Sequence, residues 1–301
     1  MDNRLPFVDI MEEGGTHRRH DDIGSFEYTY KAEIMNIYPM TANEKLYQIQ
    51  IIEPDRRNRF TFQPGQFVML EIPGVGEAPF SISSSPIRHG FVELCIRNVG
   101  NLTGFLARMQ RGAQIGIRGP FGTQFPVGEM EGSDVLLVAG GLGIVPLRAA
   151  ILTVLENRSR YGGVDIVYGA KTPSELLFTY QYDMWRKFDI NLSIIVETPD
   201  DTWKGPTGFL TRILEDRVAQ AGANFAAGTY AIVCGPPVMF KFVCGMLTRA
   251  GMPMQKMFVS LERRMHCGRG KCCRCNIGST YTCLKGPVFD YWSIMNLKEA
   301  I

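Results

Sequence analysis

Five of the eight cysteines in this chain fall within one short segment, MHCGRGKCCRCNIGSTYTC, at residues 265–283. So many thiols close together do not build an ordinary apolar core; they are joined in pairs or gathered around a metal centre. The first 25 residues hold no apolar run of the kind a secretory leader needs, so we expect a reducing, cytoplasmic location. Clustered cysteines there act more often as metal ligands or redox groups than as disulfides. The segment therefore predicts a loop that wraps a metal centre.

The spacing of these cysteines indicates which centre this is. It reads C-x4-C-x2-C followed by a fourth cysteine after seven residues, which is typical of plant-type [2Fe–2S] sites. Glycines between the first two cysteines allow the loop to bend around the cluster. A zinc site, which usually shows two C-x2-C pairs, and a [4Fe–4S] site remain as lesser alternatives. Cys273 is expected to be a bystander, and the predicted ligands are Cys267, Cys272, Cys275 and Cys283.

Basic residues surround the predicted cluster. A [2Fe–2S] centre held by four thiolates is an anion, so nearby cations would stabilise its reduced form and raise its reduction potential. The same cations are equally typical of a solvated surface, and a docking site for an acidic partner is a third interpretation. They are Arg263, Arg264, Arg269, Lys271 and Arg274.

The composition is that of a globular protein with more than one domain. The chain has 301 residues, of which 45% are apolar and 21% charged, which is enough to fill real cores. A net charge of +2 favours neither nucleic acid nor a membrane surface as a partner. The most apolar long run, residues 135–152, is broken by glycines, a proline and Arg148, so no membrane span is expected.

The hydrophobic pattern changes along the chain and divides it into parts. Residues 28–127 show many short alternating segments separated by turn residues, which predicts an antiparallel β-barrel. Residues 128–255 alternate apolar strands with helical segments, which predicts a doubly wound parallel sheet. Residues 256–301 form a small cysteine-rich module, and the polar residues 1–27 are either a tail or a docking arm for a partner subunit.

Two segments of the predicted barrel suit a flat, phosphate-bearing ligand. In GEAPFSISSSP (76–86), a strand offers N–H groups and the hydroxyls of Ser81 or Ser83 to the edge of a heterocycle. In IRNVGNLTGFLARMQRG (96–112), Gly100 and Thr103 precede a helix whose N-terminus favours a phosphate, and Arg97 would add a charge-assisted contact. Taken alone, the second segment is more often an ordinary helix N-cap.

A strand, a glycine-rich turn and a helix open the predicted α/β domain, in DVLLVAGGLGIVPLRAA (134–150). Gly140, Gly141 and Gly143 let the backbone approach a pyrophosphate, whose charge the helix N-terminus favours. The third glycine of the G-x-G-x-x-G pattern is replaced by Pro146, which fits a first helical turn. A plain strand–turn–helix is the alternative interpretation.

Together these motifs resemble the ferredoxin–NADP reductase superfamily, in which a barrel binds FAD ahead of a nucleotide domain. The family motif Arg-x-Tyr/Phe-Ser falls on residues 78–81, and alanine stands where the arginine would hold the flavin pyrophosphate. Arg97 or backbone groups must then replace that arginine, and FAD is expected rather than FMN. The FAD contacts that the resemblance implies are Ala78, Pro79, Phe80, Ser81, Arg97, Val99, Gly100, Asn101, Thr103 and Gly104.

The same resemblance identifies the nicotinamide side. It places YAIVCGPPVMFKFV (230–243) beside the nicotinamide ring with Cys234 near the hydride path, although a buried cysteine is more often a packing residue. It places VYGAKTPSELLF (167–178) at the adenosine ribose, without a choice between NADH and NADPH. The implied NAD(P) contacts are Gly140, Gly141, Gly143, Ile144, Pro146, Gly169, Lys171, Cys234, Gly235, Pro236 and Pro237.

The cysteine module narrows the resemblance. LERRMHCGRGKCCRC and CLKGPVF resemble the modules of cytoplasmic NAD(P)-linked nickel–iron (sulf)hydrogenase gamma subunits, anaerobic sulfite reductase B subunits and dihydroorotate dehydrogenase electron-transfer subunits. GEAPFSIS, which lacks the arginine, is closer to the first two. The resemblance covers residues 28–295 and implies a diaphorase-type subunit of a hetero-oligomeric complex. Such a subunit moves electrons between NAD(P)H and a redox partner subunit through FAD and a [2Fe–2S] cluster.

Other functions stay open at this point. A free-standing NAD(P)H:acceptor reductase, acting on ferredoxin or quinones, would use the same cofactors. A zinc-binding interaction protein with a relic nucleotide fold would be no enzyme at all. The four histidines are scattered and hydride transfer to a flavin needs no acid or base, so no catalytic residue beyond the cofactors is expected.

Overall fold

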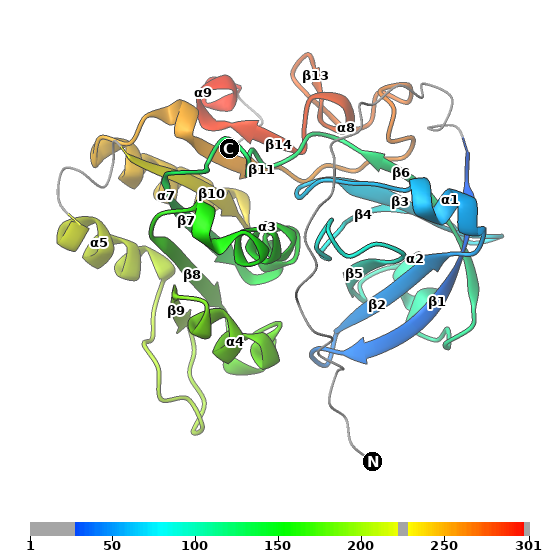
Figure 1. Ribbon diagram of the computed structural model, residues 1–301, viewed down its shortest axis with the longest axis horizontal. Helices are drawn as coiled ribbons and strands as arrows, with labels where there is room; N and C mark the ends of the chain where they lie inside the picture. The colour runs from blue at the N-terminus through cyan, green and yellow to red at the C-terminus, as the bar shows by residue number, and fades with distance from the viewer. Residues whose placement is uncertain (1–27, 222–227, 298–301) are drawn as a thin grey trace.

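The computed structural model describes residues 28–221 and 228–297, so the predicted N-terminal extension lies outside the described residues. A barrel-like sheet and a sheet flanked by helices stand side by side, and the cysteine segment lies along the top of both in Figure 1. The predicted fold class, a β-barrel followed by a doubly wound α/β unit and a cysteine-rich module, is confirmed. Within the two described ranges, no helix is long and apolar enough to cross a bilayer.

The first sheet consists of antiparallel strands. They are β1 (Tyr30–Pro39), β2 (Glu44–Ile51), β3 (Phe67–Ile72), β4 (Gly76–Ser81), β5 (Val92–Arg97) and β6 (Gln114–Phe121), accompanied by short helices α1 (Pro54–Arg59) and α2 (Asn101–Leu106). Their order is β4-β3-β6-β1-β2-β5, and the outer strands β4 and β5 contact each other, which closes the sheet into a barrel. Apolar side chains at every second position, such as Val68 and Leu70 of β3, fill its interior.

The second sheet has parallel strands and one antiparallel edge strand, β14. Its elements are β7 (Asp134–Gly140), β8 (Val164–Ala170), β9 (Ile190–Val196), β10 (Thr229–Cys234), β11 (Met257–Ser260) and β14 (Val288–Asp290), with helices α3 (Ile144–Glu156), α4 (Tyr182–Lys187), α5 (Leu210–Ala221) and α7 (Pro237–Arg249). Ile151 of α3 and Trp185 of α4 share one core, whereas Leu214 of α5 and Phe240 of α7 share another. Helices therefore cover both faces of the sheet.

The strand order β14-β11-β10-β7-β8-β9 reverses between β7 and β10. The chain adds β8 and β9 on one side of β7 and then returns to add β10 and β11 on the other. Open α/β sheets bind ligands at such a switch point, beyond the carboxyl ends of the strands. Short 3-10 turns complete this unit: η2 (Gly141–Gly143), η3 (Arg158–Arg160), η4 (Pro173–Glu175), η5 (Thr179–Gln181) and η6 (Met254–Lys256).

The cysteine segment is an insertion between two neighbouring strands of the second sheet. The chain leaves β11 at Ser260 and returns in β14 at Val288, and these two residues are paired with each other. The insertion carries β12 (Asn276–Ile277), β13 (Thr280–Tyr281) and α8 (Thr282–Lys285), and α9 (Tyr291–Ile294) follows β14. Both ends of the insertion are thus fixed by the pairing of β11 with β14. The start of the cysteine module at residue 256 stays a prediction.

Candidate redox site

The two predicted flavin segments lie against each other on the barrel. Helix α2 contacts β4, which brings the loop before α2 to the strand that holds Ala78, Pro79, Phe80 and Ser81. All four of these residues are half-buried, and Val99 in the loop is exposed. This part of the barrel therefore presents a continuous, partly open face.

Thr103 organises the loop at the start of α2. Its Oγ1 accepts hydrogen bonds from the N–H groups of Val99 at 3.0 Å and Gly100 at 2.9 Å. The N–H of Gly104 donates to the carbonyl of Gly100 at 2.7 Å, so Asn101 begins a regular first turn. The first N–H groups of a helix lack intrahelical acceptors, so this turn suits an FAD phosphate.

Two polar side chains near this face have partners inside the protein. Arg97 of β5 forms an ion pair with the buried Glu44 of β2, while 37% of the arginine side chain remains exposed. Ser83 is fully buried, and its hydroxyl donates to the carbonyl of Glu93 at 3.0 Å. The hydroxyl left at the open face is that of Ser81, and the contact of Arg97 with a pyrophosphate stays a prediction.

The glycine-rich turns after β7 and β10 pack directly on each other. A Cβ atom on Gly143 would overlap the carbonyl group of Cys234, and a Cβ atom on Gly140 would lie 2.7 Å from Sδ of Met239. Gly141 has a φ of +53°, a conformation that side chains disfavour. These turns bring the predicted glycines to the switch point between β7 and β10. Helix α3 begins there, with Ile144 and Pro146 in its first turn. Helix α7 begins there as well, at Pro237, just after Pro236.

The predicted adenosine side adjoins this point. Gly169 of β8 pairs with Gly140 of β7, so the two glycines lie on the same edge of the sheet. A Cβ atom on Gly169 would lie 3.2 Å from Leu210, which shows how closely α5 approaches the strand. Lys171 is exposed just beyond β8. The contact of a dinucleotide with Lys171, Gly169 and the turn at Gly235 stays a prediction.

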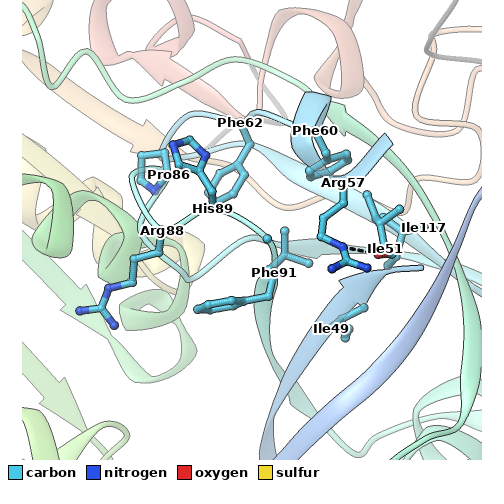
Figure 2. A pocket seen from close by; sticks show the side chains of 12 residues that line it. Ile49, Ile51, Arg57, Phe60, Phe62, Pro86, Arg88, His89, Phe91 and Ile117 are labelled. Carbon is cyan, nitrogen blue, oxygen red and sulfur yellow. Dashed lines mark hydrogen bonds between the residues drawn. The ribbon is translucent and has the colours of Figure 1, made fainter. Parts of the chain in front are cut away.

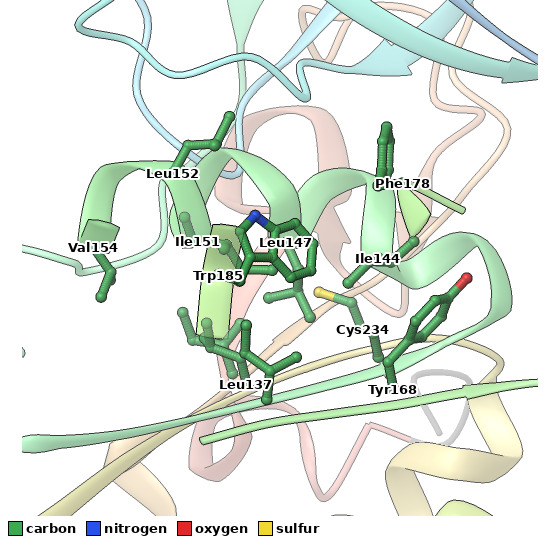
Figure 3. Packing of buried hydrophobic residues seen from close by; sticks show 14 of the residues in the cluster. Leu137, Ile144, Leu147, Ile151, Leu152, Val154, Tyr168, Phe178, Trp185 and Cys234 are labelled. Atoms are coloured by element: carbon green, nitrogen blue, oxygen red, sulfur yellow. The ribbon is translucent and has the colours of Figure 1, made fainter. Parts of the chain in front are cut away.

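The thiol of Cys234, by contrast, lies in the apolar core. Figure 3 shows it among Ile144, Leu147 and Tyr168. Burial raises the pKa of this thiol, and the nearby Glu262 carboxylate raises it further. Cys234 is therefore a neutral packing group in this conformation. Its position beside the nicotinamide stays a prediction, which the place of its backbone at the end of β10 supports.

The four predicted cluster ligands converge around one loop. The N–H of Gly270 donates to Sγ of Cys283 at 3.0 Å, and the N–H groups of Arg269 and Lys271 donate to Sγ of Cys267 at 3.3 and 3.4 Å. The side chain of Cys272 hydrogen-bonds with Cys267, and that of Cys275 with Cys283. Gly268 and Gly270 have φ values of +71° and +68°, which allow this winding. Sulfurs that accept backbone N–H bonds suit an iron–sulfur cluster.

The surroundings of these thiols differ. Burial opposes ionisation of Cys267, but the N–H groups of Arg269, Cys272 and Lys271 lower the pKa of its thiol to about 7. Burial and Cys275 raise the pKa of the Cys283 thiol to about 12. In the part of the chain that the structure describes, no three His, Cys, Asp or Glu side chains are arranged to hold a single metal ion.

The buried cysteines of the loop rest on the flavin barrel. Cys275 and Cys283 share an apolar cluster with Phe67, Met69, Phe121 and Met265. Phe67 and Met69 belong to β3, where they pair with Ser81 and Pro79 of β4. Only one strand therefore separates the predicted flavin strand from two of the predicted cluster ligands.

Arg118 of β6 links the cluster loop to the flavin strand, and the sequence analysis missed it. Its guanidinium donates to the carbonyl of Cys267 at 3.3 Å and lies 2.6 Å from Oε2 of Glu77, the residue before Ala78. It also lies over the ring of Phe121, 5.7 Å from the ring centre. No local signal marks this arginine, because its partners are 41 and 149 positions away in the chain.

Arg148 joins the nucleotide unit to the barrel. It lies on α3, is 2% exposed, and approaches Oε2 of Glu93 on β5 at 2.6 Å. It also donates to the carbonyl of Ser83 at 3.0 Å and to Oε1 of Gln181 at 2.8 Å. The sequence shows Arg148 only as an interruption of an apolar run. In the fold, it ties the helix that follows the glycine-rich turn to a barrel strand.

A small cavity at the end of the barrel is separate from this arrangement. Its volume is about 20 Å³, which is room for one water molecule. Figure 2 shows Arg57 and His89 at its rim, with Arg57 donating to the carbonyl of Ile51 at 2.8 Å. None of the predicted cofactor contacts, all of which lie in the described ranges, lines this cavity. A volume of this size is too small for a flavin or a dinucleotide.

Comparison with known proteins agrees with this arrangement part by part. Residues 31–125 match the oxidoreductase FAD-binding domain and residues 137–245 the oxidoreductase NAD-binding domain. Residues 262–295 match the iron-sulfur cluster binding domain of dihydroorotate dehydrogenase B. The chain is 40% identical over 274 residues to sulfhydrogenase 1 subunit gamma of Pyrococcus furiosus, covering 89% of this chain and 92% of that protein. The chain belongs to this family of oxidoreductase subunits.

Other members and a solved structure extend the comparison. The chain is 35% identical over 233 residues to a probable dihydroorotate dehydrogenase B (NAD(+)), electron transfer subunit, of Methanocaldococcus jannaschii, covering 76% and 80% of the two chains. An NADH-dependent reduced ferredoxin-NADP oxidoreductase has the same fold, with a TM-score of 0.68 at 23% identity over 88% of this chain and 91% of that one. The chain is an oxidoreductase that uses FAD, an iron–sulfur cluster and NAD(P)H, as predicted.

Proposed function

We propose that this chain is the electron-transfer subunit of a hydrogenase-type complex, which moves electrons between NAD(P)H and a redox partner subunit. The observation that carries the proposal is the packing of Cys275 and Cys283 on Phe67 and Met69, one strand away from the flavin strand. FAD supplies the chemistry that links a two-electron hydride donor to a one-electron cluster. The protein therefore has to place three cofactors close together, and the packing of Cys275 and Cys283 on β3 supports this arrangement.

The residues of the chain divide this task. The glycine-rich turns at the ends of β7 and β10 receive the dinucleotide, and Arg148 holds α3 against the barrel beside them. The face of β4 and the turn at Gly100 receive FAD. Cys267, Cys272, Cys275 and Cys283 hold a [2Fe–2S] cluster, whose sulfurs accept N–H bonds from the loop. Each of these assignments is part of the proposal.

The nature of the partner is inferred from two observations. Ala78 stands where the usual flavin motif has an arginine, and in this GEAPFSIS resembles the hydrogenase and sulfite reductase branches more than the dihydroorotate branch. The identity of 40% to a sulfhydrogenase gamma subunit exceeds the 35% to a dihydroorotate dehydrogenase electron-transfer subunit. A dihydroorotate dehydrogenase partner is the second candidate, and a cytoplasmic location is part of the same proposal.

The test uses the purified protein with its cofactors. NADH or NADPH should bleach the flavin absorption and then produce the electron paramagnetic resonance signal of a reduced [2Fe–2S] cluster. Cys272→Ser should keep flavin reduction and lose the cluster signal. Cys273→Ser is the matched control, because Cys273 is exposed beside the ligands, and it should keep both. Flavin reduction that leaves the wild-type cluster oxidised refutes the proposal, and a colourless protein holding one zinc ion does so as well.

Purification of the complex from the native organism identifies the partner. A hydrogenase subunit that co-purifies in a fixed ratio is the expected result. Dihydroorotate dehydrogenase in the same position establishes the second candidate instead. A lone chain that reduces ferredoxin or quinones at full rate contradicts both.

A further inference from the structure

The charge of the chain is concentrated around the predicted cluster. Residues 262–285 contain six lysines and arginines and one glutamate, a formal net charge of +5. Because the whole chain carries +2, the remaining residues carry −3. The cysteine insertion is therefore a strongly positive lobe on a protein that is otherwise slightly negative.

Part of this charge lies on one surface beside the cluster loop. The stretch 270–274 runs alongside 281–285, since the N–H of Gly270 donates to Sγ of Cys283 and Sγ of Cys273 lies 3.2 Å from the hydroxyl of Tyr281. Both stretches present exposed side chains there. We call this surface the cation face, and it consists of Lys271, Cys273, Arg274, Leu284 and Lys285.

The cation face is where the cluster site reaches the surface. The barrel covers Cys275 and Cys283, which are 1% and 2% exposed. Cys267 and Cys272 are both only partly covered. The carbonyl of Cys267 accepts a hydrogen bond from Arg118 of the barrel, whereas Cys272 lies between Lys271 and the exposed Cys273. An electron that enters from the flavin side therefore leaves most directly through the cation face.

Two cations of this face, Arg274 and Lys285, are available to an outside partner. Arg274 and Lys285 form no ion pair with any residue in 28–221 or 228–297. Leu284, beside Lys285, is 50% exposed and lies against the backbone at Gly270. An apolar contact with charges around it is typical of protein docking, in which complementary charge sets the encounter rate.

We propose that the cation face docks the acidic surface of the one-electron partner. The proposal rests on the electron-transfer function stated above and adds the charge of the partner and the place where it binds. In the transfer, the reduced cluster loses one electron and the acceptor gains one, with no bond made or broken. Electrostatic attraction raises association rates by about 10- to 1,000-fold, and salt weakens it.

The test compares two soluble one-electron acceptors of high reduction potential and opposite charge, a plant plastocyanin that is strongly acidic and a mitochondrial cytochrome c that is strongly basic. The holoprotein is reduced with NADH or NADPH, and the rate of electron transfer to each acceptor is measured. The rate counted for each acceptor is the part that Cys272→Ser abolishes, so both rates report transfer from the cluster and not from the flavin. Their ratio is then compared. We expect this ratio to favour plastocyanin and to fall at least tenfold between about 0.01 M and about 0.3 M salt.

Charge reversal locates the effect on the surface. The variant Arg274→Glu/Lys285→Glu should lower the plastocyanin to cytochrome c ratio at low salt by about tenfold or more. Lys187→Glu/Lys204→Glu is the matched control, since both lysines are exposed on the nucleotide unit and the change in net charge is identical. This control should change the ratio by less than about twofold.

The outcomes separate this proposal from the function on which it rests. If NAD(P)H leaves the wild-type cluster oxidised, the proposed function fails. If the cluster is reduced but the ratio of the two rates is insensitive to salt, or changes equally in both double variants, the proposed function stands. The proposal that the cation face docks the partner is then refuted. The reduction potential of the cluster is measured in each variant, because a shift in potential moves both rates in the same direction and leaves their ratio nearly unchanged.

Discussion

Arg148 offers a test of how the nucleotide unit is held on the barrel. The change Arg148→Met removes the guanidinium and leaves the Glu93 carboxylate, whose side chain is 12% exposed, without its partner at 2.6 Å. The carbonyl of Ser83 and Oε1 of Gln181 lose a donor at the same time. Breaking a buried ion pair from one side destabilises proteins by about 3–5 kcal/mol, because the remaining charge stays buried. We expect a loss of that size in the free energy of unfolding.

The assay is urea unfolding of the cofactor-loaded protein, with the slope of the transition checked for constancy. The double variant Arg148→Met/Glu93→Gln leaves no unpaired buried charge. Its loss in the free energy of unfolding should therefore be about 1–3 kcal/mol smaller than the sum of the losses in the two single variants. Arg186→Met is the control, since Arg186 pairs with Asp183 on the surface, where both side chains are largely exposed. That change should alter stability by less than about 1 kcal/mol.

Two results would refute the reasoning about Arg148. One is a single variant that unfolds within about 1 kcal/mol of the wild type, which means that the pair contributes no more than a surface pair. The other is additivity in the double variant, which means that the two side chains do not interact in the folded protein. The conservative change Arg148→Lys should fall between the wild type and the methionine variant, because an ammonium keeps the charge but not the fork of donors.

Three further predictions concern the cluster and the domain contact. Arg118→Met removes a cation beside an anionic cluster and should lower the reduction potential of the cluster. Glu77→Gln leaves Arg118 without its counter-charge and should raise that potential. Redox titration measures both shifts, and two shifts in the same direction contradict the argument. Gly270→Ala introduces a Cβ at a φ of +68° against Leu284 and should reduce the iron content while sparing flavin, and Leu284→Ala in the same chain should restore part of it. Burial raises the pKa of the Glu156 carboxyl, so its ionisation opposes folding above the folded-state pKa and has no effect below the unfolded-state value. Glu156→Gln should accordingly stabilise the protein at about pH 7 and lose that advantage at about pH 4, and a urea midpoint difference that is the same at both values contradicts the assignment.

The sequence was most informative where the chemistry is local. Cys267, Cys272 and Cys275 lie within nine residues, so their spacing alone limits what they can bind. The turn at Gly140–Gly143 is local in the same way, because the strand before it and the helix after it fix its geometry. These features, with the change from strand alternation to strand–helix alternation, were sufficient to predict the fold class and the family.

Contacts between distant parts of the chain were beyond the reach of such patterns. The arginine noted as a break in an apolar run, Arg148, meets Glu93 across 55 positions, and Arg118 meets Cys267 across 149. Nothing in the local sequence of either residue specifies those partners. Likewise, the glycine spacing does not show that Cys234 turns its thiol into the core, since this depends on α3 packing over β10. Tertiary packing decides these roles.

The pairing of β11 with β14 has a consequence for how the protein matures. Because Ser260 and Val288 are held opposite each other, the cysteine insertion is a closed loop on a sheet whose own core does not include the ligands. The entropy of closing that loop is already lost when the sheet forms, so it need not be supplied by iron. Loss of the cluster would therefore leave both ends of the insertion paired with each other.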